Sequence, residues 1–67
     1  MTKAERENWL DNIKASAQTV AQEIGWDRVR FVLSEYGGGA SSIENLRPGY
    51  YESVWNELFD IEREMKD

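Results

Sequence analysis

Acidic side chains recur at helical spacing near the end of the chain, at Glu57, Asp60, Glu64 and Asp67. Residues three or four apart lie on one side of a helix, which places neighbouring carboxylates roughly 6 Å apart. Such a row imitates the charge spacing of a phosphate backbone and predicts binding to a basic surface of another protein. The alternative interpretation is a solvated helix face. Neither an EF-hand spacing nor a histidine accompanies the carboxylates, so we predict no metal site.

Aromatic side chains beside the apolar positions form a second candidate site, at Trp9, Phe31, Tyr50 and Phe59. Exposed together, they would form a patch suited to a protein partner, because aromatic anchors mark interfaces. The alternatives are that a small core absorbs them or that the domain buries them as a weak homodimer. The predicted partner-binding residues combine both sites: Glu57, Asp60, Glu64, Phe59 and Tyr50.

Three arginines form the only basic cluster near the glycine-rich stretch, at Arg28, Arg30 and Arg47. Paired with stacking aromatics such as Tyr36 or Tyr50, they would suit single-stranded nucleic acid. The net charge of −5 opposes the approach of phosphate at long range. A nucleic-acid contact through the arginines is therefore the second hypothesis, after a protein partner.

The composition removes most enzyme chemistries. The 67 residues include no cysteine and no histidine, the commonest metal ligand and general base. We therefore predict no catalytic residues, no cofactor and no enzymatic activity. The polar start, MTKAERENW, is neither a signal peptide nor a membrane span, which predicts a cytoplasmic protein. The length predicts one domain over residues 1–67, near the lower limit for a core without staples.

Helical periodicity governs three segments of the sequence and predicts an all-α three-helix bundle, with helices at about 3–24, 26–36 and 48–65. Thr2 and Glu5 form a capping box at the first helix, and Gly25 is a left-handed stop. Pro48 suits the first position of the third helix. The predicted buried positions are Leu10, Ile13, Ala17, Val20 and Ile24 in the first helix, Trp26, Val29, Val32, Leu33 and Tyr36 in the second, and Tyr51, Val54, Trp55, Leu58, Ile61 and Met65 in the third. The aromatics are expected to supply most of the core's bulk.

The glycine-rich stretch YGGGASSIENL is predicted to connect the second and third helices. A phosphate-binding loop would need a preceding strand and a following lysine, and neither is present. Gly37 is expected to adopt a left-handed cap, with Gly38 and Gly39 reversing the chain. A one-turn helix near 42–46 then directs Ile43 and Leu46 to the core. A contact site at the tip of the loop is the alternative interpretation.

The segment WDRVRFVLSEYGGGASSIENLRPGYYESVWNELFDIE, Trp26 to Glu62, resembles short helical segments of small proteins from phages and conjugative elements of Gram-positive bacteria. The shared features are an aromatic and valine helix ending in Tyr-Gly, then Ser-Ile-Glu-x-Leu-x-Pro and a Tyr-led helix. Similar endings occur in phage recombination proteins. The resemblance implies a mobile-element origin and an interaction module or small acidic inhibitor of a host or rival system. Its alternative is an accessory single-stranded nucleic-acid-binding domain of a recombination or replication system.

Overall fold

The computed structural model describes residues 1–65 and has three α-helices, α1 (Lys3–Ile24), α2 (Trp26–Tyr36) and α3 (Tyr51–Met65). Two short 3-10 turns, η1 (Ile43–Asn45) and η2 (Pro48–Tyr50), join α2 to α3. The predicted all-α bundle is confirmed, and residues 1–65 contain no strand. No helix in this range is long and apolar enough to cross a membrane. Asp67, the last member of the predicted acidic row, lies outside the described residues.

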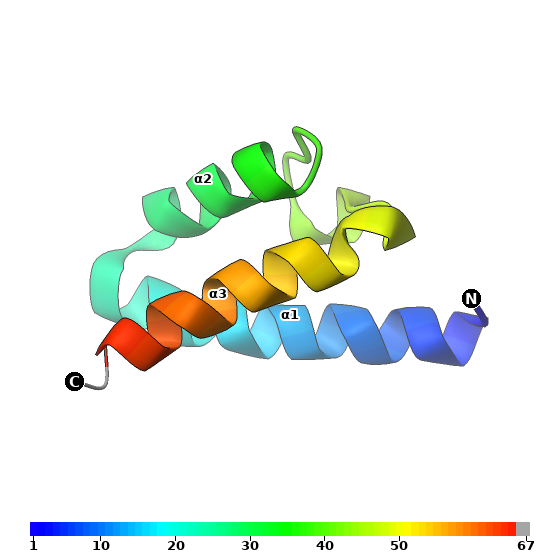
Figure 1. Ribbon diagram of the computed structural model, residues 1–67, viewed down its shortest axis with the longest axis horizontal. Helices are drawn as coiled ribbons and strands as arrows, with labels where there is room; N and C mark the ends of the chain where they lie inside the picture. Colours follow the sequence, from blue (N-terminus) through cyan, green and yellow to red (C-terminus); the bar gives the residue numbers. More distant parts are fainter. Residues whose placement is uncertain (66–67) are drawn as a thin grey trace.

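The helix α1 runs the length of the molecule and packs against both other helices, most extensively against α3 (Figure 1). The chain runs along α1, returns in the opposite direction along α2, and then runs along α3 in the same direction as α1. The predicted capping box starts α1: the Thr2 hydroxyl accepts from the Glu5 amide at 3.1 Å, and the Glu5 carboxylate accepts from the Thr2 amide at 3.2 Å. Two of the orphan amides of the first turn are thereby satisfied.

Gly25 alone separates α1 from α2. Its amide donates to the Ala21 carbonyl at 2.8 Å, which closes the last turn of α1. Its φ of 96° is positive, as predicted, but its ψ of 159° is extended, so the residue is not in the left-handed helical region. The extended ψ turns the chain sharply enough for α2 to begin at the next residue. This combination of angles is essentially restricted to glycine.

The core is aliphatic except for Tyr51. Along α1, Ile13, Ala17 and Val20 are fully buried, while Leu10 is half-buried. The prediction that Ile24 is buried is wrong, because its side chain is 50% exposed. The remaining buried core residues come from the other elements: Val29, Val32, Leu33, Ile43, Leu46, Tyr51, Val54, Leu58 and Ile61.

Most of the aromatic residues lie outside this core, which corrects the prediction that they supply most of its bulk. Tyr51 is the aromatic residue that is fully buried, at 2% exposure. Trp55 and Met65, also predicted to be buried, are half-buried. Trp26 and Tyr36, likewise predicted to be buried, are 49% and 42% exposed. They are the first and last residues of the 11-residue helix α2.

The glycine connection follows its predicted course with a different role for Gly37. Its φ of −107° and ψ of 16° are not left-handed, whereas Gly38 and Gly39 have φ values of 69° and 82°. Gly37 is instead required for space, since an added Cβ would lie 2.5 Å from the Leu33 carbonyl oxygen and 2.6 Å from Leu46 Cδ2. Leu46 can pack under the end of α2 only because residue 37 has no side chain.

The predicted one-turn helix near 42–46 is the 3-10 turn η1, which buries Ile43 and is followed by the buried Leu46. Lys14 Nζ on α1 lies 3.1 Å from the carboxylate of Glu44, which ties this turn to the first helix. Pro48 begins η2, and the α-helical pattern of α3 starts at Tyr51. The third helix is therefore three residues shorter at its start than predicted.

Replacing Leu58 by alanine should lower the free energy of unfolding by about 2–5 kcal/mol, because it leaves a cavity where a fully buried side chain stood. Trp55→Ala should cost less, because a side chain at the margin of the core leaves an opening that water fills. Urea denaturation followed by circular dichroism at 222 nm measures both. A larger loss for Trp55→Ala would contradict the aliphatic core described above.

Substitution of Gly37 by alanine should destabilise the domain by about 1–3 kcal/mol, the usual cost of overpacking. Gly49→Ala is the matched control, since nothing lies within 4 Å of an added Cβ there and its φ is not positive. The control should be neutral or stabilising by up to about 1 kcal/mol. Equal melting temperatures for the two variants would show that Leu46 does not pack against residue 37.

Candidate interaction surface

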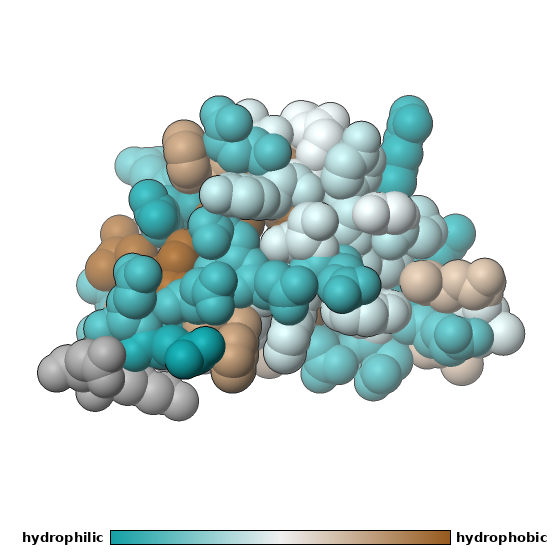
Figure 2. All heavy atoms as spheres, in the orientation of Figure 1, coloured by the Kyte–Doolittle hydropathy of each residue, from teal (hydrophilic) through white to brown (hydrophobic). Residues whose placement is uncertain are grey.

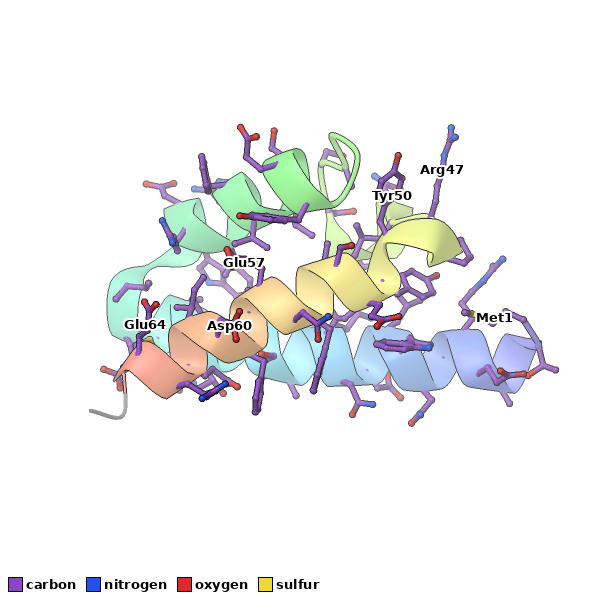
Figure 3. The ribbon with its side chains drawn as sticks, viewed as in Figure 1. Met1, Arg47, Tyr50, Glu57, Asp60 and Glu64 are labelled. Atoms are coloured by element: carbon purple, nitrogen blue, oxygen red, sulfur yellow. The ribbon has the colours of Figure 1, made fainter. Side chains whose placement is uncertain are left out.

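The predicted acidic row lies along one side of α3. Glu57, Asp60 and Glu64 come from successive turns, as the labelled side chains of Figure 3 show. Glu57 is half-buried and the other two are exposed. Asp60 lies 4.0 Å from Arg63, the one basic residue of α3. On the face of the molecule in Figure 2, hydrophilic side chains follow the outward side of α3.

Glu57 lies toward α2 and acts on Tyr36, the last residue of that helix. Hydrogen bonding to the Glu57 carboxylate, and then its negative charge, raise the pKa of the Tyr36 hydroxyl above the usual value of 10.0. The acidic row thus begins beside an exposed aromatic ring, at the junction of α2 and α3.

The opposite flank of α3, toward α1, is aromatic. The Trp55 and Phe59 rings stack with their centroids 5.1 Å apart and their planes 10° from parallel. The Arg63 guanidinium lies 6.0 Å from the centroid of the Phe59 ring. Nearby, Trp9 of α1 packs on the buried Tyr51 with a centroid distance of 6.4 Å. The sequence prediction named Trp9 and Phe59 as surface aromatics and assigned Trp55 to the core, yet all three line this flank.

Two hollows of about 340 and 380 Å³ lie between α1 and α3. The first is lined by Glu5, Asn8, Trp9, Asn12 and Trp55. The second is lined by Asn12, Ala15, Ser16, Thr19, Trp55, Phe59 and Glu62. Sequence reasoning missed the polar wall on α1. The spacing of Glu5, Trp9, Asn12, Ser16 and Thr19, by fours and threes, is the signal that would have revealed one continuous side of the helix.

Tyr50, the remaining residue predicted to contact a partner, lies apart from Phe59, at the end of η2 and just before α3. Its ring covers Gly38, where an added Cβ would be 2.7 Å from Tyr50 Cε2. Together with Arg47 and the three glycines it lines a polar hollow beside the loop. Figure 3 shows Tyr50 and Arg47 projecting at the same end of the molecule. The structure therefore groups Tyr50 with the glycine loop and separates it from the aromatic flank of α3.

The structure does not gather the three arginines. Arg28 and Arg30 lie in the first half of α2, where Arg28 is 5.6 Å from the Phe31 ring and Arg30 pairs with Asp27. Arg47 lies beyond the far end of α2, close to the glycine loop (Figures 1 and 3). A single strand of nucleic acid would have to follow the whole length of α2 to meet all three.

A further hollow of about 340 Å³ lies between α1, α2 and η1, beside the exposed Trp26. Its apolar lining, Val29, Leu33 and Ile43, belongs to the core, and its rim carries the Lys14 and Glu44 ion pair. Residues 1–65 contain no group of three or more histidine, cysteine, aspartate or glutamate side chains that could hold a metal ion.

Comparisons of the chain with protein-family models, with curated proteins and with solved structures found no match.

Glu57→Gln should lower the pKa of Tyr36 toward its usual value, because the substitution removes the negative charge that opposes ionisation. Folding raises the pKa of Tyr36 above its value in the unfolded chain. The contact with Glu57 therefore contributes fully to the free energy of unfolding below pH 10, and its contribution is lost as the pH rises through the pKa of the folded state. Titration of ring-labelled tyrosine by carbon NMR distinguishes Tyr36 from the other two tyrosines. An unchanged Tyr36 titration in the variant would exclude the contact with Glu57.

Proposed function

We propose that the chain is a non-enzymatic protein-interaction domain that presents the outward side of α3 to a basic partner. One observation carries the proposal: the exposed surface of α3 has an acidic row on one flank and stacked aromatic rings on the other. Its single cation, Arg63, is already engaged by Asp60 and Phe59. A partner that carries basic and apolar side chains would complement both flanks.

Exposed aromatic residues support a macromolecular partner. Five large aromatic side chains are 41–50% exposed: Trp26, Phe31, Tyr36, Tyr50 and Phe59. Tryptophan and tyrosine are enriched among the residues that dominate binding energy at interfaces. A domain of 67 residues that leaves this much aromatic surface in water gains free energy by covering it.

The charge distribution favours a protein over nucleic acid as the partner. The chain carries a net charge of −5, and two of the three candidate arginines are engaged within α2, Arg28 with Phe31 and Arg30 with Asp27. The resemblance of residues 26–62 to proteins of phages and conjugative elements supports a finer proposal. In it, the domain is a small acidic inhibitor that occupies a basic surface of a host or rival protein. The alternative remains an accessory single-stranded nucleic-acid-binding domain.

Charge reversal on α3 tests the proposal. The double variant Asp60→Lys with Glu64→Lys should lose the partner in an affinity pull-down from host lysate, analysed by mass spectrometry with and without nuclease. Glu7→Lys with Glu23→Lys is the matched control, since it makes the same change of charge at exposed positions of α1. Both variants should keep the helical circular dichroism spectrum, because exposed substitutions usually change stability by no more than about 0.5 kcal/mol.

Two results would contradict the proposed function. If the Asp60→Lys, Glu64→Lys variant and its control recover the same partners in equal amounts, the acidic row of α3 is not part of the interface. Tight binding of a single-stranded oligonucleotide, weakening with a log–log salt slope of about −0.7 per phosphate contact, would establish the nucleic-acid alternative instead.

A further inference from the structure

The outward side of α2 is open to solvent. The residues of this helix that face the core are Val29, Val32 and Leu33. Phe31 and Ser34 fall on the opposite side because of their spacing, and both are exposed. In Figure 1, α2 forms the upper edge of the molecule. Since the Phe31 side chain is 50% exposed, the outward side of α2 is centred on a large apolar ring in water.

The charges of α2 form a self-complementary pattern. Asp27 and Arg30 pair with each other. Arg28 and Glu35 take part in no ion pair within residues 1–65, and both are exposed. They lie seven residues apart, about two turns, and therefore on one flank of the helix, with Phe31 between them. A helix with a cation toward its start and an anion toward its end on one flank matches an antiparallel copy of itself.

The contact between Arg28 and Phe31 is compatible with such a pairing. The Arg28 guanidinium lies over the Phe31 ring, 5.6 Å from its centroid. A guanidinium that lies over a ring keeps N–H donors at its edge, and these can bind a carboxylate. Ser34, one turn beyond Phe31, has a small side chain that leaves room for a ring from a second helix.

The charge of α2 favours a second copy of this chain as the occupant. Its two acidic and two basic residues cancel, so the net charge of α2 is zero, whereas the whole chain carries −5. Helix α3, with five acidic residues and one basic residue, has a net charge of −4. Two acidic molecules therefore repel each other less when they approach through α2 than through α3.

We propose that two copies of the chain associate through an antiparallel contact between their α2 helices. Phe31 of each copy packs beside Ser34 of the other. Arg28 of each copy pairs with Glu35 of the other. Because both copies use the same surface, the contact is isologous and closes at a dimer. One short helix buries less area than the interfaces of stable complexes, so the dimer is weak. It goes beyond the proposed function, because it does not use the acidic row of α3.

Sedimentation velocity of the whole chain, from about 10 μM to about 1 mM, tests the proposal in the range expected for a small interface. The buffer should hold about 0.15 M salt, which screens the long-range repulsion. The apparent mass should rise with concentration from that of one chain toward that of two. Phe31→Ala should weaken the dimer at least about tenfold, because it removes an aromatic anchor from both sides. Phe59→Ala is the matched control, since Phe59 is 41% exposed on α3, and it should leave the association within about twofold.

A charge swap tests the predicted pairing directly. Arg28→Glu and Glu35→Arg should each abolish association, because like charges then meet on the flank of α2. An equimolar mixture of the two variants should form a dimer, since each variant carries the charge that the other lacks. Circular dichroism should show the same helical spectrum for both, because the substituted residues are exposed.

Three results would overturn the inference. They are a constant mass up to about 1 mM, an association that Phe31→Ala leaves unchanged, and a mixture of the charge-swap variants that stays monomeric. A dimer that Phe59→Ala disrupts while Phe31→Ala does not would place the contact on α3, which also excludes α2. Failure of the proposed function is read separately, from the pull-down with the acidic-row variant, whose α2 is unchanged.

Discussion

Close packing along one narrow aliphatic seam of α1 determines the rest of this structure. Ile13, Ala17 and Val20 are completely buried, and Ala17 lets neighbouring helices approach closely because it has almost no side chain. Close packing along this seam has interior volume for one aromatic ring, that of Tyr51, which is 2% exposed. Rings on the flanks of α2 and α3 consequently stay partly in water. The chemistry of the surface thus follows from the size of the residues inside.

The sequence predicted the helices well because each has local signals for its ends. The capping box at Thr2 and the single glycine at position 25 set the limits of α1 to the residue. Pro48 was a weaker signal, since proline at a first position suits a 3-10 turn as well as an α-helix, and the structure uses the former. The space restriction at Gly37 comes from the Leu33 carbonyl oxygen and from Leu46 Cδ2. The contact with Leu46 was not predictable, because that residue lies nine positions further along the chain.

Periodicity located the acidic row but could not show the hollows between α1 and α3. Glu57, Asp60 and Glu64 share a side of one helix, which spacing alone establishes. Each hollow between α1 and α3 needs both helices, and Asn12 and Trp55, which line the two hollows, lie more than forty residues apart in sequence. Exposure of terminal residues was missed for a related reason. A periodic stripe predicts burial up to both ends of a helix, whereas Trp26 and Tyr36, the terminal residues of α2, are 49% and 42% exposed.

The single-residue link at Gly25 determines where the length of this domain can vary. Adding or deleting one residue within a helix turns everything beyond it by about 100°, and no flexible segment between α1 and α2 could take up that rotation. The connection between α2 and α3 contains Gly39, around which nothing lies within 4 Å of an added Cβ. Insertions and deletions tolerated by the fold therefore belong in the glycine loop, while the spacing across the α1–α2 corner is fixed.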